Sequence, residues 1–170
     1  MGLEVYNQKR NFKETTEPEG KKSRKSKKLQ FVVQRHAASR LHYDFRLEVD
    51  GVLKSWAVPK GPSLNPKDKR LAMMVEDHPF AYRTFEGTIP KGNYGAGEVE
   101  IWDKGYYEPL SKSKGKSQDK LMLQELDEGS LKVVLYGEKL KGEFALVKIK
   151  NGNQENAWLL IKHNDDHAVT

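Results

Sequence analysis

Hydrophobic and polar residues alternate strictly from Leu41 to Val49, where every second side chain is apolar. This two-residue period predicts a half-buried β-strand. Asp50-Gly51 follows, and this pair favours a two-residue hairpin because both central positions of a type I′ turn need positive φ. The expected pairs on the apolar face are Val49 with Val52, Leu47 with Lys54, Phe45 with Trp56 and Tyr43 with Val58.

Short apolar runs separated by Gly, Pro and Asn recur along the rest of the chain. They predict strands over residues 29–33, 71–75, 98–103, 130–136, 143–149 and 158–162, a turn over 76–79 and a short helix over 121–128. Many short strands with one or two short helices are typical of a mainly β fold, and we expect a small antiparallel β-barrel. We assign this domain to residues 29–165, after a flexible basic arm (1–28) and before a C-terminal tail (166–170).

The polar face of the first hairpin strand carries His42, Asp44 and Arg46. In the expected register this face lies opposite Ser55 and Ala57, whose small side chains leave room for a ligand. Alternate residues on a strand are roughly 6.5 to 7 Å apart, so His42 and Asp44 can converge on one ion while Arg46 binds an anion. The same spacing also fits a solvated strand face with a surface ion pair.

His36, upstream of this strand, can complete the set from a loop or bend. Two imidazoles and a carboxylate suit manganese, cobalt or zinc and leave coordination positions open for water and substrate. The guanidinium of Arg46 offers a planar fork for phosphate oxygens. The residue types therefore predict a metal ion beside a phosphate.

Three further polar residues follow the hairpin. Lys60 lies in a loop rich in Pro and Gly just after the second strand, and His78 stands beside two carboxylates. As a turn residue His78 would hydrogen-bond locally, whereas as a catalytic group it would donate a proton to a leaving oxygen or hold a phosphoryl oxygen. Tyr82, four residues on, shares either role.

The net charge is +6, from 30 Lys and Arg against 24 Asp and Glu. Residues 21–28 alone carry six positive charges, so the rest of the chain is formally neutral. Binding to DNA would then use a basic arm with Lys21, Lys22, Arg24 and Lys25 as contacts, and the alternative is a solvated linker. Since cysteine, a membrane-spanning apolar run and a signal peptide are all absent, we expect a soluble cytoplasmic protein.

Five motifs occur in order along the chain. They are QRHAASRLHYDFRLE (34–48), KSWAVPKGP (54–62), VEDHP (75–79), FEGTIPKGNYG (85–95) and WLLIK (158–162). This series resembles the 3′-phosphoesterase domain of bacterial and archaeal DNA ligase D, an end-joining repair enzyme. The resemblance implies a small β-barrel with its site in a groove. It also implies a manganese-dependent enzyme that removes a terminal ribonucleoside from a DNA 3′ end and then hydrolyses the 3′-phosphate to a 3′-hydroxyl.

The resemblance further implies roles for the residues at matching positions. By position, the metal ligands are His36, His42 and Asp44, the scissile phosphate is bound by Arg46, Lys60, Arg70, His78 and Tyr82, and the arm contributes Arg10, Asn11 and Glu17. His78 would be the proton donor or transition-state stabiliser. The implied partners are the 3′ ends of primer-template DNA, a separate DNA ligase and other end-joining proteins.

Asn11 stands where the family's pattern has an acidic residue, and we expect this to weaken ribonucleoside removal more than phosphate hydrolysis. The polymerase and ligase domains usually attached are absent from the sequence, so we expect the chain to work alone or beside separate partners. One alternative is a non-catalytic module that caps DNA 3′ ends and recruits a ligase. Another is an iron oxygenase, because two histidines and a carboxylate also form a facial triad, although Arg46, Lys60 and Arg70 favour phosphate.

Overall fold

The computed structural model describes residues 3–21, 28–111, 115–150, 152 and 154–170. The elements, in chain order, are α1 (Glu4–Gln8), β1 (Leu29–Ala37), β2 (Leu41–Val49), β3 (Val52–Val58), β4 (Lys69–Pro79), the 3-10 helix η1 (Phe80–Thr84), β5 (Gly87–Ile89), β6 (Gly97–Pro109), α2 (Gln118–Glu128), β7 (Ser130–Gly137), β8 (Lys141–Lys148) and β9 (Ala157–Lys162). Within these described ranges, no helix is long and apolar enough to cross a membrane.

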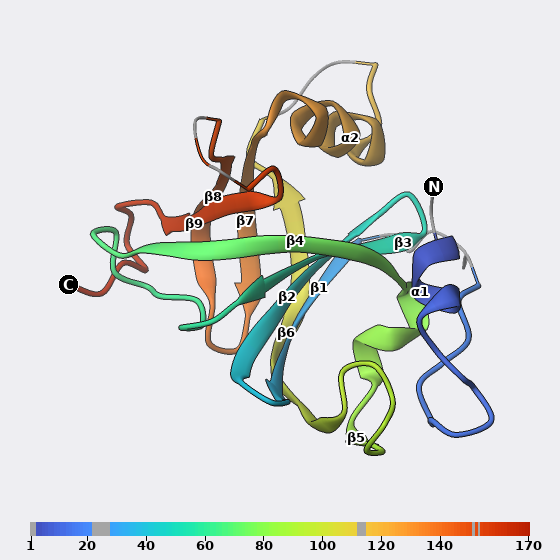
Figure 1. Cartoon of the computed structure of the whole chain (residues 1–170). Coiled ribbons are helices and arrows are strands. Elements are labelled where there is room, and N and C mark those ends of the chain that lie inside the picture. Colours follow the sequence, from blue (N-terminus) through green and yellow to red (C-terminus); the bar gives the residue numbers. More distant parts are fainter. Residues whose placement is uncertain (1–2, 22–27, 112–114, 151, 153) are drawn as a thin grey trace.

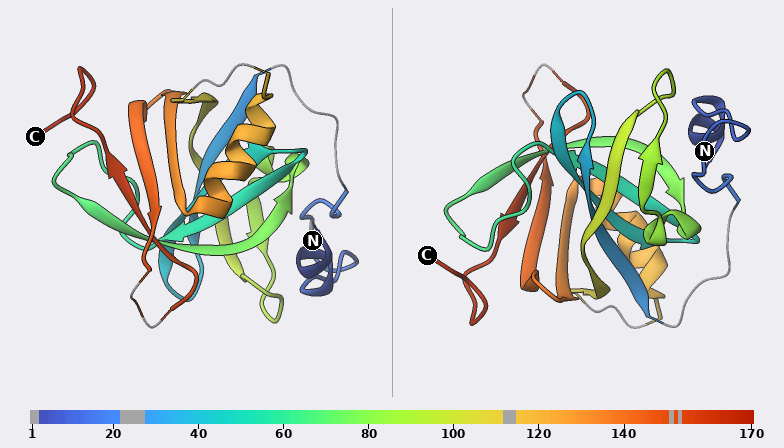
Figure 2. Two further views of the ribbon diagram at one scale, coloured as in Figure 1. Left: turned by 90° about the horizontal axis from the view of Figure 1, so that it is seen from above. Right: turned by 90° about the horizontal axis from the view of Figure 1, so that it is seen from below.

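Eight antiparallel strands close into a barrel, which confirms the predicted fold class (Figure 1). The order around the barrel is β1-β2-β3-β4-β9-β8-β7-β6, and the pairing of β6 with β1 closes the ring. β5 is an additional short strand that pairs with β6 outside this ring. The two views in Figure 2 show α2 across one end of the barrel and α1 outside the wall, beside β4.

The β2–β3 hairpin has the register predicted from the sequence. Val49 pairs with Val52 and Phe45 pairs with Trp56, so the turn consists of Asp50 and Gly51. Both turn residues have positive φ, at 50° and 84°, as a type I′ turn requires. This register places alternate side chains of β2 inside the barrel and the polar set between them on its outer face.

The main hydrophobic core fills the barrel interior. Phe45 and Trp56 are fully buried there, and Met122 of α2 packs into the same cluster from the barrel end. The helix that carries Met122 is capped at its start by Ser117, whose side chain accepts a hydrogen bond from the Lys120 amide, and at its end by Gly129, which has φ 80°. These caps fix the helix that closes the barrel.

A second, smaller core lies on the outer face of the barrel wall. It joins the arm, η1 and β5 to strands β3 and β6, and its buried members are Tyr6, Leu53, Tyr82, Phe85, Ile89 and Val99. The outer face of β1 to β4 is therefore covered at one end by the arm and by the η1–β5 segment. This cover bounds the site described below.

Two local predictions were wrong. Residues 76–79 do not form a turn, because β4 continues through His78 to Pro79 opposite β3. His36 does not lie in a loop or bend, since it belongs to β1 and pairs directly with His42 of β2. In both cases hydrogen bonding to a neighbouring strand extends the strand beyond its short apolar run. The local sequence pattern does not show which strands will be neighbours.

The described part of the arm, residues 3–21, packs against the barrel, which the sequence analysis did not predict. Tyr6 of α1 is fully buried, and its hydroxyl donates to the Pro18 carbonyl. The aromatic anchors of this segment, Tyr6 and the partly buried Phe12, do not follow the period of a helix or strand. At the other end, the Val169 amide donates to the Leu64 carbonyl at 2.9 Å. The boundaries at 29 and 165 stay a prediction.

Candidate metal and phosphate site

Two paired strands bring together the three residues expected to hold a metal. His36 of β1 lies opposite His42 of β2, and Asp44 follows on the same outer face. Nδ1 of His36 is 3.4 Å from Oδ2 of Asp44, and Nε2 of His42 is 3.2 Å from Oδ1. Among the described residues, these form one group whose possible ligand atoms all lie within 4.8 Å of one another.

Asp44 concentrates negative charge in a buried position. Burial alone would raise the pKa of this carboxyl, but Arg46 and the two imidazoles hold that pKa well below its usual range. Burial lowers the pKa of His42, yet the hydrogen bond and the charge of Asp44 raise it by more. The carboxylate is thus ionised, and it favours positive charge between the imidazoles, supplied by protons or by a metal ion.

The outer nitrogens of both imidazoles are held by backbone carbonyls. Nε2 of His36 donates to the Gly95 carbonyl at 2.6 Å, and Nδ1 of His42 donates to the Arg40 carbonyl at 3.2 Å. Carbonyls only accept, so each outer nitrogen carries a hydrogen and the other nitrogen faces Asp44. Such outer partners are typical of metal-binding histidines, and the donor set therefore fits a divalent ion.

Arg46 lies beside the triad on β2 and is almost fully buried. Its Nη2 is 3.3 Å from Oδ2 of Asp44, and its Nε donates to the Gln34 side chain at 2.6 Å. Its Nη1 is buried with no hydrogen-bond partner among the described residues. The guanidinium also lies 4.9 Å from the Tyr82 ring centre. A buried cation with one uncommitted donor edge is suited to an anion.

A β-bulge turns His78 toward the same face. Leu53 pairs with His78 and Ser55 with Val75, so β4 has one more residue than β3 over this stretch. Nδ1 of His78 donates to the Glu76 carbonyl at 3.0 Å. Burial, with the positive charges of Arg46 and Arg10, holds the pKa of His78 well below its ordinary value. His78 is therefore neutral near pH 7.

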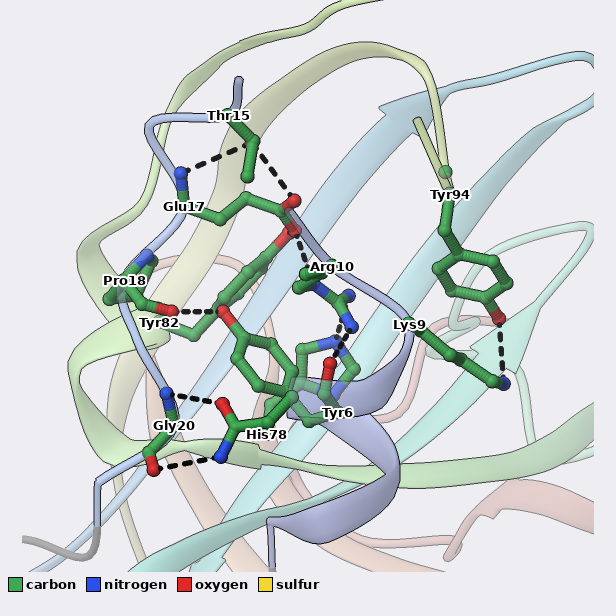
Figure 3. A network of polar contacts seen from close by, with 12 residues as sticks. Tyr6, Lys9, Arg10, Thr15, Glu17, Pro18, Gly20, His78, Tyr82 and Tyr94 are labelled. Carbon is green, nitrogen blue, oxygen red and sulfur yellow. Dashed lines mark hydrogen bonds and ion pairs between the residues drawn. The ribbon is translucent and has the colours of Figure 1, made fainter. Parts of the chain in front are cut away.

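The arm contributes a buried ion pair to the site (Figure 3). Oε2 of Glu17 accepts from Nε of Arg10 at 2.9 Å and from the Tyr82 hydroxyl at 2.6 Å. Nη2 of Arg10 is 3.3 Å from Nε2 of His78, which accepts because its other nitrogen carries the hydrogen. Burial raises the pKa of Tyr82 well above its ordinary value, so it remains a phenol.

These side chains surround one pocket of about 280 Å³. It is lined by Arg10, His36, Ala38, His42, Asp44, Arg46, Ala57, Val75, Glu76, His78, Tyr82, Ile89, Tyr94 and Gly95. At its rim Lys9 donates to Glu76 at 3.2 Å and to the Tyr94 hydroxyl at 3.4 Å. The pocket thus combines a possible metal-binding triad, two guanidiniums, an imidazole and a phenol.

Some predicted residues lie elsewhere. Lys60 and Arg70 line a separate hollow of about 430 Å³ with Lys67 and Lys69. Asn11 is exposed, and its side chain donates to Glu14 at 2.8 Å within the arm.

Lys21 is exposed near Glu19, at 3.9 Å. Lys22, Arg24 and Lys25 lie outside the described residues. Of these four residues only Lys21 is described, and it does not line the pocket.

Residue-by-residue reasoning missed Gln34, Glu76, Tyr94 and Gly95. Gln34 precedes His36 by two positions on one strand, so alternation was the signal that could have found it. Gly95 is close to the imidazole of His36, where an added Cβ would lie 3.3 Å from Cε1. The contacts of Glu76 and Tyr94 with the arm depend on tertiary packing, and nothing in the local sequence indicates them.

The fold and the pocket define a class of protein, namely a small antiparallel β-barrel with a possible metal-binding triad beside buried arginine side chains on the outer face of its wall. A family model described as the DNA ligase D 3′-phosphoesterase domain matches residues 34–148. The chain belongs to this family.

Several curated relatives are similar to almost the entire chain. The multifunctional non-homologous end joining protein LigD of Pseudomonas aeruginosa is 49% identical over 168 residues, which is 98% of this chain and 19% of that protein. LigD of Mycolicibacterium smegmatis is 43% identical over 164 residues, or 96% of this chain and 21% of the relative. The chain thus spans about a fifth of the length of these relatives.

Proposed function

We propose that this chain is a metal-dependent 3′-end-healing phosphoesterase of DNA repair. In this role it removes a terminal ribonucleoside from a DNA 3′ end and hydrolyses the remaining 3′-phosphate to a 3′-hydroxyl. The observation that carries the proposal is the position of Arg46, whose buried uncommitted Nη1 lies beside the triad of possible metal ligands. The names of the relatives, which refer to end joining, support DNA ends as the substrate.

His36, His42 and Asp44 would hold the metal, which we propose to be manganese, with cobalt or zinc as substitutes. When bound, the ion would supply a Lewis acid that stabilises charge on phosphate oxygens and lowers the pKa of water. The backbone carbonyls of Gly95 and Arg40 keep both imidazoles in the tautomer that this role needs. The cations beside the triad favour a phosphate substrate over the chemistry of an iron oxygenase.

Arg46 would bind and orient the scissile phosphate. Its guanidinium is held in a plane by two contacts, so the remaining donor needs little reorganisation when charge develops. Arg10 adds a second positive charge from the arm, next to His78. The buried Glu17 offsets part of that charge and fixes the direction of the Arg10 side chain.

His78 and Tyr82 would handle protons at the leaving oxygen. In the substrate-free protein His78 is neutral and its Nε2 is an acceptor. A phosphate dianion nearby would favour the protonated imidazole, which is the form that donates to a leaving group. Tyr82 remains a phenol, and its single hydroxyl hydrogen would have to move from Glu17 to the leaving oxygen for it to donate to the same group.

We propose that Lys60 and Arg70 bind a neighbouring phosphate of the DNA and not the scissile one. Ala57 lines the pocket, and Lys60 follows three residues later, at most about 11 Å away along the chain. The hollow around Lys60 contains four basic side chains and has no residue in common with the pocket. A separate DNA ligase and other end-joining proteins are proposed partners of this chain.

A metal-dependence assay tests the proposal. Purified protein is incubated with an oligonucleotide that carries a 3′-phosphate, with EDTA or with manganese, cobalt, zinc or magnesium. We expect release of inorganic phosphate with manganese and none with EDTA or in the Asp44→Asn variant. Binding of the oligonucleotide without any release in every metal would favour a non-catalytic end-binding module.

A further inference from the structure

Gln34 is fully buried on β1, and its side chain joins two parts of the site. Its Oε1 accepts from Nε of Arg46 at 2.6 Å. Its Nε2 donates to the carbonyls of Tyr82 at 2.8 Å and Phe85 at 3.1 Å. One amide thus ties the guanidinium on β2 to η1, although Gln34 itself does not line the pocket.

The contact with Gln34 determines which edge of Arg46 stays available. Nε is used by Gln34 and Nη2 by Asp44, whereas Nη1 has no partner within the described chain. The guanidinium is planar, so two contacts fix both its plane and the direction of the third nitrogen. Without Gln34 the head of Arg46 would keep its contact with Asp44 and its place over the Tyr82 ring, and neither of these fixes the plane of the guanidinium as a second hydrogen bond does.

An amide fits this position better than a carboxylate. Glutamine offers a neutral acceptor to Arg46, so the full positive charge of the guanidinium remains for an anion. Its two amide hydrogens satisfy two carbonyls that a carboxylate would repel. The residue type therefore suits both of its neighbours.

We propose that Gln34 is a positioning residue that directs Nη1 of Arg46 toward the substrate phosphate and holds η1, which carries Tyr82, in place. This inference rests on the proposed function, since it assigns Arg46 to the phosphate. It predicts that loss of Gln34 weakens recognition of a 3′-phosphate through Arg46, and not through a general loss of structure.

The test measures phosphate recognition without turnover. Binding of two labelled oligonucleotides, one ending in a 3′-phosphate and one in a 3′-hydroxyl, is followed by fluorescence anisotropy in EDTA. The ratio of the two affinities reports the phosphate contact and cancels effects common to both ends. The variants are Gln34→Met, which keeps the volume but loses the hydrogen bonds, and Gln30→Met as a control on the same strand outside the pocket.

We expect the 3′-phosphate preference to fall roughly tenfold in Gln34→Met and to stay unchanged in Gln30→Met. In an Arg46→Lys background, which lacks the Nε donor, Gln34→Met should cause no further loss. A preserved preference in Gln34→Met, or an equal loss in the Arg46→Lys background, would overturn the inference.

Two further results complete the test. If Gln34→Met does not fold, Gln34→Glu decides, because it keeps an acceptor for Arg46 while cancelling its charge. We expect it to lose the preference as well, and a preserved preference overturns the inference. A wild-type protein that binds both ends equally would reject the proposed phosphate pocket itself, and that outcome is distinct from a failure of Gln34 alone.

Discussion

Asp44 is the residue on which the charges of the pocket converge. Its two oxygens face His36, His42 and Arg46, each within 3.4 Å, and only 5% of the residue is exposed. A buried carboxylate with three cationic or protonated neighbours stays ionised far below neutral pH. It therefore provides the negative charge that a divalent cation bound between the imidazoles would need.

Replacing Asp44 by Asn removes this charge with almost no change in volume. Loss of a residue that only hydrogen-bonds a metal ligand typically lowers metal affinity roughly 10- to 100-fold. Because Asp44 would itself be a ligand, we expect the affinity for manganese to fall by more than that. Electron paramagnetic resonance of free manganese in a titration measures this affinity. The matched control is Asp127→Asn, an exposed position on α2. Equal manganese affinities in Asp44→Asn and wild type would reject the triad as the metal site.

His78 gives the protein a pH-dependent stability with a definite sign. Its folded-state pKa is lowered, so the unfolded chain binds a proton first as the pH falls below about 6.5. The stability it contributes is present above that pH and is lost on acidification. His42 has a raised pKa, and its contribution is present below about pH 6.5 and is lost only as the pH rises further.

Between about pH 4.5 and about pH 5.5, where His42 is protonated in both states, His78 is thus the one of these two histidines that contributes to the slope. We expect the midpoint of thermal unfolding to change less over this interval in His78→Asn than in wild type, while His42→Asn keeps the wild-type slope. Calorimetry at the two pH values makes the comparison. The same slope in His78→Asn and wild type would show that this imidazole is not held neutral by burial.

At the scale of elements, Tyr6 is the fully buried aromatic anchor of the arm, and it acts beside polar contacts from the arm to Glu76, His78 and Tyr82. Tyr6 contacts the rings of Phe12, His78 and Tyr82, with centroids 5.0 to 6.0 Å away. The cation of Arg10 lies 3.9 Å from the Tyr6 ring centre. Because Arg10 lines the pocket from this arm and is held there by Glu17, we expect the position of Tyr6 to determine whether the pocket is complete.

Tyr6→Ala should release the arm without unfolding the barrel. Truncation of a buried aromatic side chain to Ala destabilises the part of the protein that unfolds together with it by about 3 to 5 kcal/mol. We expect amide exchange over residues 4–20 to accelerate strongly while β2 and β3 keep their protection, and phosphate release to decline. Val5→Ala, at a side chain that is 45% exposed, is the control. Equal acceleration in the barrel strands would show that arm and barrel form one unit.

Elements with a local signal could be predicted from the sequence. The alternation from Leu41 to Val49 and the Asp50-Gly51 pair specify β2, its turn and its register, because both are short-range effects. The arm, η1 and the bulge in β4 could not be predicted in this way. Each is held by packing against distant strands, as the 65-residue separation between Glu17 and Tyr82 illustrates.

For the whole molecule, the site lies where the barrel wall meets its outer cover. The residues of β2 were predictable as a site because strand alternation puts His42, Asp44 and Arg46 on one face. Arg10 and Glu17 came from the resemblance alone, since no spacing rule connects the arm with the wall. The separation of Lys60 and Arg70 from the pocket required the three-dimensional structure.

The basic hollow should affect DNA binding but not the metal. Each lost phosphate contact lowers the dependence of log affinity on log salt by roughly one for duplex DNA. We expect Lys60→Gln and Arg70→Gln each to reduce this slope while manganese affinity stays at the wild-type value. Lys132→Gln, at an exposed position on β7, is the control. An unchanged salt slope, or a loss of manganese binding, would contradict the assignment of this hollow.

We propose that this barrel heals DNA 3′ ends in two steps at one pocket that binds both a metal and the phosphate. The most direct test follows a primer-template that ends in a single 3′-ribonucleotide, incubated with the protein and manganese, with His42→Ala as the control. We predict that a 3′-phosphate product appears first and a 3′-hydroxyl product later, and that neither forms in the variant. Unprocessed primer with the wild-type protein, or equal product formation in His42→Ala, would contradict the account.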